Sequence, residues 1–207
     1  MDKAPEEGTL VQILTCSPHA GGSTETIASL IAERTAVSGV PAHIVQLRNH
    51  LIRPCTGCGY CAVHQDHCTL DGHGDSAQAL LQSIRESDLT LFVIPVYFYG
   101  PPALFKGLID RAQRYWGLLD RQRGRDAPRR PALAILCAAR TRGERLFEAN
   151  LLILRCFLDL LGLELEPPLL LRGIETPADI VANRRVLSSL QDVSDQAIHL
   201  IRGTTHV

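Results

Sequence analysis

Residues Thr9–Thr24 read TLVQILTCSPHAGGST and contain the clearest structural signal in the chain. The first seven residues form an apolar run typical of a buried parallel strand, and Ser17-Pro18 and a glycine pair end that run. Ile27 and Ile31 then recur at the spacing of a helix, which Gly39 ends. A strand joined to a helix by a short loop is the repeating unit of a doubly wound α/β sheet.

The same alternation continues along the rest of the chain. Four further apolar runs predict strands, the last with Pro167-Pro168 at an edge or bulge: Ala42–Leu47, Leu89–Val96, Ala132–Cys137 and Leu163–Leu171. Helical spacing predicts four more helices: Ser76–Glu86, Ala103–Tyr115, Glu144–Leu161 and Asn183–Ile201. We therefore expect one domain over residues 1–207, with a parallel sheet covered by helices on both faces.

Composition excludes several classes of protein. The 207 residues are 45% hydrophobic with a net charge of −1, which argues against disorder and against general binding to nucleic acid. Residues 1–8 are polar, without the pattern of a secretory signal, and we expect them to be flexible and the protein to be cytoplasmic. The longest apolar run, Leu151–Leu163, is interrupted by Arg155 and Asp159, so no membrane span is predicted.

The loop after the first strand is suited to binding a phosphate. Its Ser and Thr residues supply hydroxyl donors, its glycines let the backbone approach, and the following helix offers free N–H groups. The alternative is an ordinary turn with a helix cap at Ser23 or Thr24. The loop lacks the lysine of a nucleotide triphosphatase and the G-x-G-x-x-G of a dinucleotide fold, which favours a mononucleotide such as FMN.

A second loop follows the third strand, where Pro95–Arg111 read PVYFYGPPALFKGLIDR. Ligands of open parallel sheets bind beyond the carboxyl ends of the strands, so the two loops are expected to face each other. Ser17–Thr24 resembles the Ser-Pro-Arg-x-Gly-Gly-Asn-Thr loop of NAD(P)H-dependent FMN reductases and iron-sulfur flavoproteins. Pro95–Arg111 resembles a segment of the same flavodoxin-like superfamily, with its Pro-x-Tyr and Lys-x3-Asp-Arg.

The resemblance implies a flavodoxin-like sheet of five parallel strands in the order 2-1-3-4-5 that binds FMN. The phosphate would be bound by Ser17, His19, Gly22, Ser23 and Thr24. The isoalloxazine ring would be flanked by Pro95, Val96, Tyr97, Phe98 and Gly100. This chain has His19 where the family usually has arginine and Ser23 where it has asparagine. The loss of the fixed charge at position 19 is expected either to weaken phosphate binding or to make it depend on pH.

Four cysteines lie together in the irregular segment 48–75. Cys55, Cys58, Cys61 and Cys68 have the form C-x2-C-x2-C-x6-C, a spacing that permits a [4Fe-4S] cluster. It resembles the cysteine motif of iron-sulfur flavoproteins, with Asp71 near the position of an acidic pair, although relatives retain Cys-x2-Cys-x2-Cys without a cluster. Zinc is a rival, because histidines lie among the cysteines: His64, His67 and His73. Free, reversibly oxidised thiols are the third alternative.

These features predict an FMN-dependent oxidoreductase in which the flavin, and no side chain, performs the chemistry. The first alternative is an NAD(P)H-dependent reductase of quinones, nitro compounds or other small acceptors. The second is an iron-sulfur electron carrier that exchanges electrons with a ferredoxin, and the third is a non-enzymatic thiol or metal sensor.

Other residues have plainer interpretations. Helix 144–161 is apolar over most of its circumference, which suggests a homodimer or a higher homo-oligomer. The arginines of Arg121–Arg130 either attract the phosphates of a nicotinamide cofactor or form a solvated loop. Lys106, Asp110 and Arg111 are expected to be structural. An ion pair from Asp110 or Arg111 would hold this helix to its neighbour. The isolated cysteines are expected to be inert packing residues: Cys16, Cys137 and Cys156.

Overall fold

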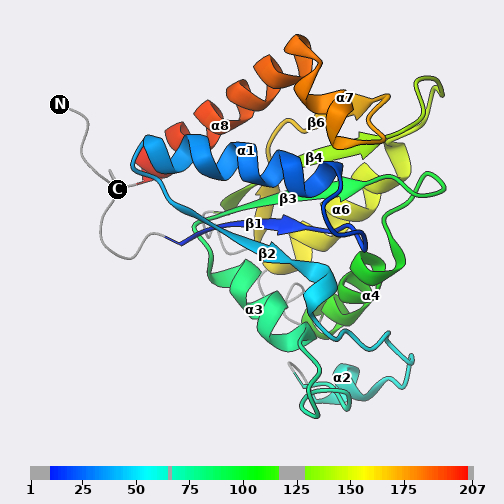
Figure 1. Ribbon diagram of the computed structural model, residues 1–207. Helices are drawn as coiled ribbons and strands as arrows, with labels where there is room; N and C mark the ends of the chain where they lie inside the picture. Colours follow the sequence, from blue (N-terminus) through cyan, green and yellow to red (C-terminus); the bar gives the residue numbers. More distant parts are fainter. Residues whose placement is uncertain (1–9, 65–66, 117–128, 205–207) are drawn as a thin grey trace.

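A computed structural model describes residues 10–64, 67–116 and 129–204. Its centre is a parallel sheet in the order β2-β1-β3-β4-β5, with β6 also paired to β4 (Figure 1). The strands are β1 (Val11–Thr15), β2 (Ala42–Gln46), β3 (Leu89–Pro95), β4 (Arg130–Ala138), β5 (Leu163–Leu165) and β6 (Leu169–Arg172). The predicted flavodoxin-like order 2-1-3-4-5 is confirmed.

Helices cover both faces of this sheet (Figure 1). They are α1 (Ser23–Val37), α2 (Tyr60–Val63), α3 (Ala77–Glu86), α4 (Ala103–Arg111), α6 (Glu148–Leu161), α7 (Pro177–Val181) and α8 (Arg184–Thr204). Two 3-10 turns are η1 (Leu47–Asn49) and η2 (Ala112–Tyr115), so the predicted helix Ala103–Tyr115 ends as a 3-10 turn.

Alternation along the strands divides the core into two layers. Leu91 packs with α1, α7 and α8, whereas its neighbour Phe92 packs with α3, α4 and α6. Phe92, Phe105 and Phe157 are almost fully buried and lie with ring centroids about 6 Å apart, at 5.9, 6.2 and 5.8 Å. Because successive side chains of a strand point to opposite faces, continuous apolar runs are what this architecture requires.

The fifth predicted strand is divided in two. Leu163–Leu171 was expected as one strand, but β5 ends at Leu165 and β6 begins at Leu169, and both pair with β4. Pro167-Pro168 separates them, because proline has no N–H to donate to the sheet.

The prediction of a helix from Glu144 was wrong by one turn, since α6 begins at Glu148. Gly143 adopts φ +128° and its carbonyl accepts a hydrogen bond from Arg172 at 2.8 Å, which holds the chain outside helical geometry. Asn183 caps the N-terminus of α8 and lies just outside the helix. Its Oδ1 accepts hydrogen bonds from the N–H groups of Arg185 and Val186.

Within the described part of the chain, no helix combines the length and the apolar character needed to cross a bilayer. The expected flexible segment 1–8 and the region 117–128, which includes most of the arginine-rich stretch, lie outside the described residues. Of that stretch, Arg130 opens β4 and Arg129 forms an ion pair with Asp159 at 2.5 Å.

Candidate functional site

The predicted phosphate loop joins β1 to α1 at the edge of the sheet where the strands end. Ser17 is buried, and its Oγ accepts the N–H of His19 at 3.1 Å, while the side chain of His19 is exposed. Gly21 has φ +64°, a conformation that other residues rarely adopt. Gly22 caps α1 without a side-chain hydrogen bond, so the N–H groups of the first helical turn face this loop.

Three hydroxyl groups beside the loop are buried and unpaired. Thr15 Oγ1, Ser23 Oγ and Thr24 Oγ1 find no hydrogen-bond partner among the described residues. A buried polar group without a partner costs stability, and native proteins seldom keep several together without a role for them. Hydroxyl donors at a helix N-terminus are the groups that bind a phosphate, so this loop fits the phosphate of FMN.

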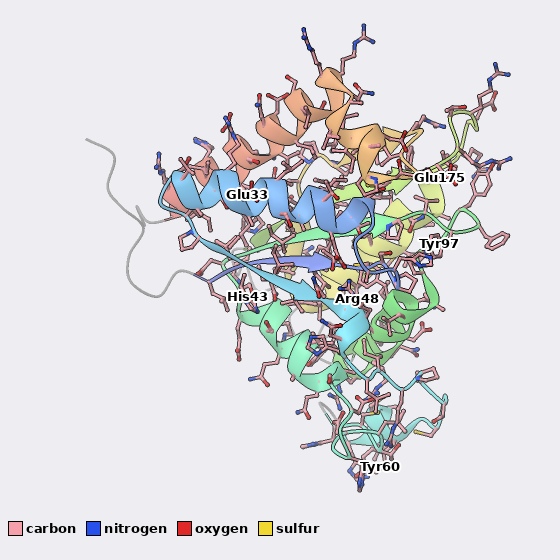
Figure 2. The ribbon with its side chains drawn as sticks, viewed as in Figure 1. Glu33, His43, Arg48, Tyr60, Tyr97 and Glu175 are labelled. Atoms are coloured by element: carbon pink, nitrogen blue, oxygen red, sulfur yellow. The ribbon has the colours of Figure 1, made fainter. Side chains whose placement is uncertain are left out.

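An acidic side chain from the first turn of α1 and an arginine from η1 also meet here. Glu25 accepts the N–H of Gly21 through Oε2 at 2.8 Å, and its other oxygen forms an ion pair with Arg48. Arg48 also donates to Gln46 Oε1 at 2.9 Å. Figure 2 shows Arg48 beyond the end of β2. Neither residue of this pair was predicted from the sequence to belong to the site.

The second predicted loop lies beside the first. Thr15 of β1 is in register with Val93 of β3, and the N–H of Cys16 donates to Val93 O at 3.0 Å. The two loops therefore leave neighbouring strands at the same level. The predicted phosphate residues and the predicted ring-binding residues are thus brought to the same edge of the sheet.

Residues 97–100 form a tight turn whose tip consists of aromatic side chains. The N–H of Tyr97 donates to Gly100 O at 2.9 Å, and the N–H of Gly100 donates to Tyr97 O at 2.8 Å. Phe98 and Tyr99 have φ values of +49° and +66°, in the left-handed region. Phe98 is fully exposed. Two consecutive aromatic residues in a costly conformation indicate a constraint other than packing.

A third loop, residues 139–145 after β4, supports this turn and was missed from the sequence. Arg140 Nη1 donates to the hydroxyl of Tyr99 at 3.0 Å, and its guanidinium lies 5.7 Å from the centre of that ring. Asn150, buried in α6, donates to the carbonyl of Tyr99 at 3.0 Å. Asn150 is one of several polar residues of α6, so the sequence alone did not indicate this contact.

The cysteine segment is anchored by buried charges. Arg111 Nη1 donates to both oxygens of Asp75 at 3.0 Å, and Arg111 Nη2 donates to Asp71 at 3.0 Å. Arg114 also pairs with Asp71, and the N–H of Cys68 donates to that carboxylate at 3.0 Å. The expected structural ion pair of Arg111 is therefore present, and it connects α4 to the end of the cysteine segment.

These contacts perturb the charged groups themselves. Burial alone would raise the pKa of Asp75, but hydrogen bonds from the Arg53 N–H, Arg111 and the Ala77 N–H lower it below its ordinary value. Burial likewise would lower the pKa of Arg111, and the hydrogen bonds to Asp75 and the nearby negative charges raise it. Both groups are therefore ionised at neutral pH.

The four predicted ligand cysteines line one cavity of about 940 Å³, between the cysteine segment, α4, η2 and α6. Across residues 10–64, 67–116 and 129–204, no three His, Cys, Asp or Glu side chains are grouped as metal ligands. The described conformation therefore assembles neither an iron-sulfur ligand set nor a zinc set, and His64 instead stacks on Tyr60 with ring centroids 4.2 Å apart.

The isolated cysteines differ from one another. Cys16 and Cys137 are buried, as predicted, and burial raises the pKa of Cys16 well above its ordinary value and that of Cys137 to about 12. The expectation that Cys156 is a packing residue was wrong. Its side chain is exposed on α6 and lines the cavity of the cysteine segment.

Comparisons with known proteins agree with this geometry. The sequence model of the NADPH-dependent FMN reductase family matches residues 9–161. An iron-sulfur flavoprotein of Methanocaldococcus jannaschii is 28% identical over 97 residues, which cover 47% of this chain and 48% of that protein. One from Archaeoglobus fulgidus is 29% identical over 91 residues, covering 44% and 43%. The match thus spans less than half the length of either relative.

Solved structures share the fold at low sequence identity. RosB with bound 8-demethyl-8-formylriboflavin-5'-phosphate superposes with a TM-score of 0.62 at 14% identity, covering 97% of this chain and 81% of RosB. The azoreductase AzrA gives 0.61 at 10% identity, with coverage of 92% and 99%. An archaeal flavodoxin gives 0.55 at 13% identity, with coverage of 96% and 100%.

Proposed function

The chain belongs to the NADPH-dependent FMN reductase family, and we propose that it binds FMN and acts as a reductase. In this proposal NAD(P)H donates the electrons, and a small molecule such as a quinone or a nitro compound accepts them. The bound flavin supplies the redox chemistry of its isoalloxazine ring, and the protein binds and orients it.

The observation that carries the proposal is the set of buried, unpaired hydroxyls at the N-terminus of α1. Ser23 and Thr24 begin the helix, and Thr15 ends the strand that leads into the loop. A phosphate placed there would accept hydrogen bonds from these hydroxyls and from the free backbone N–H groups of the helix. The same groups give no advantage to a protein that binds no anion.

The remaining predicted residues would position the ring. Val96 continues from β3, where its N–H donates to Cys137 O at 2.8 Å, so the start of the second loop is fixed by the sheet. Pro95 is the last residue of β3, and Tyr97 and Gly100 pair with each other across the tight turn that follows Val96. None of the predicted ring-binding residues has a carboxylate, amine or thiol side chain, consistent with chemistry performed by the flavin alone.

An iron-sulfur electron carrier is a second candidate. It is favoured by the four cysteines that share one cavity and by the two matched relatives, both named iron-sulfur flavoproteins. Because the thiols are not grouped in the described conformation, we derive no electron-transfer step through a cluster. In this candidate a ferredoxin would be the redox partner.

We also propose that the protein assembles as a homodimer or a higher homo-oligomer. Leu152 of α6 is 64% exposed and Trp116 is 57% exposed, and both line the same apolar cavity. Large apolar side chains gathered at a surface are typical of interfaces. Light scattering at micromolar concentration tests this, and a monomer would contradict it.

The proposed function is tested on protein purified without oxygen. We expect flavin absorption bands that bleach when NADH or NADPH is added and return when a quinone is added. Iron and sulfide analysis separates the candidates: flavin without iron supports the reductase, whereas about four irons per chain support the electron carrier. Protein that binds no flavin, even with added FMN, would overturn both.

A further inference from the structure

The phosphate loop contains no arginine or lysine. Residues 16–24, CSPHAGGST, offer hydroxyls, backbone N–H groups and one histidine, whose side chain is exposed. The phosphate of FMN carries a charge near −2 at neutral pH. Neutral donors bind such a group more weakly than charged ones. We therefore expect a positively charged side chain from outside the loop to contribute to this site.

The loop is also contacted by a negatively charged carboxylate. Glu25 lies in the first turn of α1, and its Oε2 already accepts the N–H of Gly21 at 2.8 Å. Its side chain is 18% exposed, so its charge is only partly screened by water. A dianion bound to the same loop would be repelled by this carboxylate unless another charge compensates it.

Arg48 is the side chain in position to compensate. It forms an ion pair with Glu25 and is itself 19% exposed. Arg48 Nη2 donates to Gln46 Oε1 at 2.9 Å, so the guanidinium lies between Glu25 and Gln46, and Asn49 Nδ2 holds the same Gln46 oxygen at 2.9 Å. Gln46 is in register with Thr15, which places η1 beside the start of the phosphate loop.

We propose that Arg48 is a positioning residue that makes this loop selective for a phosphate-bearing flavin. It acts through its ion pair with Glu25. Glu25 holds Gly21 in the left-handed conformation that shapes the loop. Arg48 cancels the charge of Glu25, so that a phosphate bound to this loop is not repelled by that carboxylate. This inference rests on the proposed binding of FMN.

The proposal makes a specific claim about two ligands. FMN and riboflavin share the ring and the ribityl chain and differ by the phosphate. If Arg48 acts through charge, its removal weakens FMN and leaves riboflavin nearly unaffected. If Arg48 only supports the fold of the loop, its removal weakens both.

The experiment measures the dissociation constants of both ligands by flavin fluorescence, using the full chain freed of flavin. We expect R48M to weaken FMN by about tenfold or more and riboflavin by less than about twofold. R48K keeps the charge and is expected to recover most of the loss. R34M is the matched control. Arg34 lies at the opposite end of α1 and pairs with Asp195 of α8, so this substitution is expected to leave both dissociation constants unchanged.

Two further variants isolate the charge of Glu25. E25Q keeps an oxygen for the N–H of Gly21 and removes the negative charge, so FMN binds at least as tightly as to the wild type. E25Q/R48M then binds FMN more tightly than R48M alone. Circular dichroism and thermal melting confirm that each variant is folded, and if R48M does not fold, R48K and E25Q carry the comparison.

Several outcomes overturn the proposal. Equal losses for FMN and riboflavin in R48M would make Arg48 a support of the loop only. Unchanged FMN binding in R48M would exclude a role of Arg48 in phosphate binding. Failure of E25Q to bind FMN would contradict the claim that the negative charge of Glu25 repels the phosphate. Wild-type protein that binds FMN but not more tightly than riboflavin overturns this inference alone, whereas wild-type protein that binds neither overturns the proposed function as well.

Discussion

Arg111 and Asp75 meet at 3.0 Å although 36 residues separate them, and their side chains are 1% and 0% exposed. This buried pair connects α4, which follows the second predicted loop, to the segment that carries the cysteines. Asp75 also accepts the N–H of Arg53 at 2.8 Å and that of Ala77 at 3.0 Å. One carboxylate thus joins both ends of the cysteine segment to the core of the fold.

Asp75→Asn is therefore expected to destabilise the protein. The substitution removes one of the two carboxylates that pair with Arg111 and leaves Asp71 as its remaining partner, and we expect a loss of about 2 kcal/mol in the free energy of unfolding. Urea unfolding at pH 7 measures this change. D195N, which removes the exposed partner of Arg34, is the control and should cost under about 1 kcal/mol.

The difference between D75N and the wild type should depend on pH. The pKa of Asp75 is lowered in the native state, so its contribution is fully present above its ordinary pKa of 3.8. That contribution is lost as the pH falls through 3.8 toward the lower native pKa. The difference in the free energy of unfolding between the wild type and D75N should therefore shrink from pH 7 to pH 3. A difference that stays constant over this range would contradict the role given to the Asp75 carboxylate.

Thr24→Val should separate stability from ligand binding. The hydroxyl of Thr24 is buried without a partner, so its loss is expected to leave the melting temperature unchanged or to raise it. Binding of FMN should weaken by about tenfold or more, because a hydrogen bond to a charged phosphate is lost. Thr35→Val is the matched control, since that buried hydroxyl donates to Ala32 O at 3.1 Å and lies away from the loop. A lower melting temperature for T24V with unchanged FMN binding would show that the hydroxyl is structural.

A pair of substitutions at Phe98 tests the strain in the second loop. Phe98→Ala and Phe98→Gly both remove the aromatic ring, but only glycine adopts φ +49° without cost. F98G should be more stable than F98A by about 1 kcal/mol, and both should bind FMN more weakly than the wild type. Equal stability of the two variants would mean that the turn relaxes when the ring is removed.

The strands and the places of the two loops that follow β1 and β3 could be predicted because their signals are local. Largely apolar segments mark β1, β3 and β4, which are five to nine residues long, and proline and glycine lie near their ends. The break between β5 and β6 follows from Pro167-Pro168, which the sequence also displays. The start of α6 was misplaced because a contact between Arg172 and Gly143, distant in sequence, decides it.

The supporting contacts of the site could not be predicted, because each joins residues from separate elements. Arg48 and Glu25, Asn150 and Tyr99, and Arg114 and Asp71 are ordinary polar residues until the fold brings them together. A single sequence records which residues are polar, but it does not record their partners. Cys156 was misjudged for the same reason, since only the packing of α6 shows which side of that helix is exposed.

Thiol labelling of iron-free protein should follow this difference in exposure. Cys58 and Cys156 are exposed, and hydrogen bonds from the Tyr60 backbone and the Thr69 hydroxyl lower the pKa of Cys58, which favours its reactive thiolate. Iodoacetamide at pH 7.5 should modify Cys58 first and then Cys156, whereas Cys16 and Cys137 react only after unfolding. Peptide mass spectrometry locates the modified residues, and early modification of Cys137 would contradict the core described above.

A fluorescence titration of flavin-free protein with FMN tests the proposed FMN site directly. We expect saturable quenching with one FMN per chain, and weaker binding by the T24V variant at unchanged thermal stability. Absence of saturable binding by correctly folded wild-type protein would contradict the claim that these loops form an FMN site.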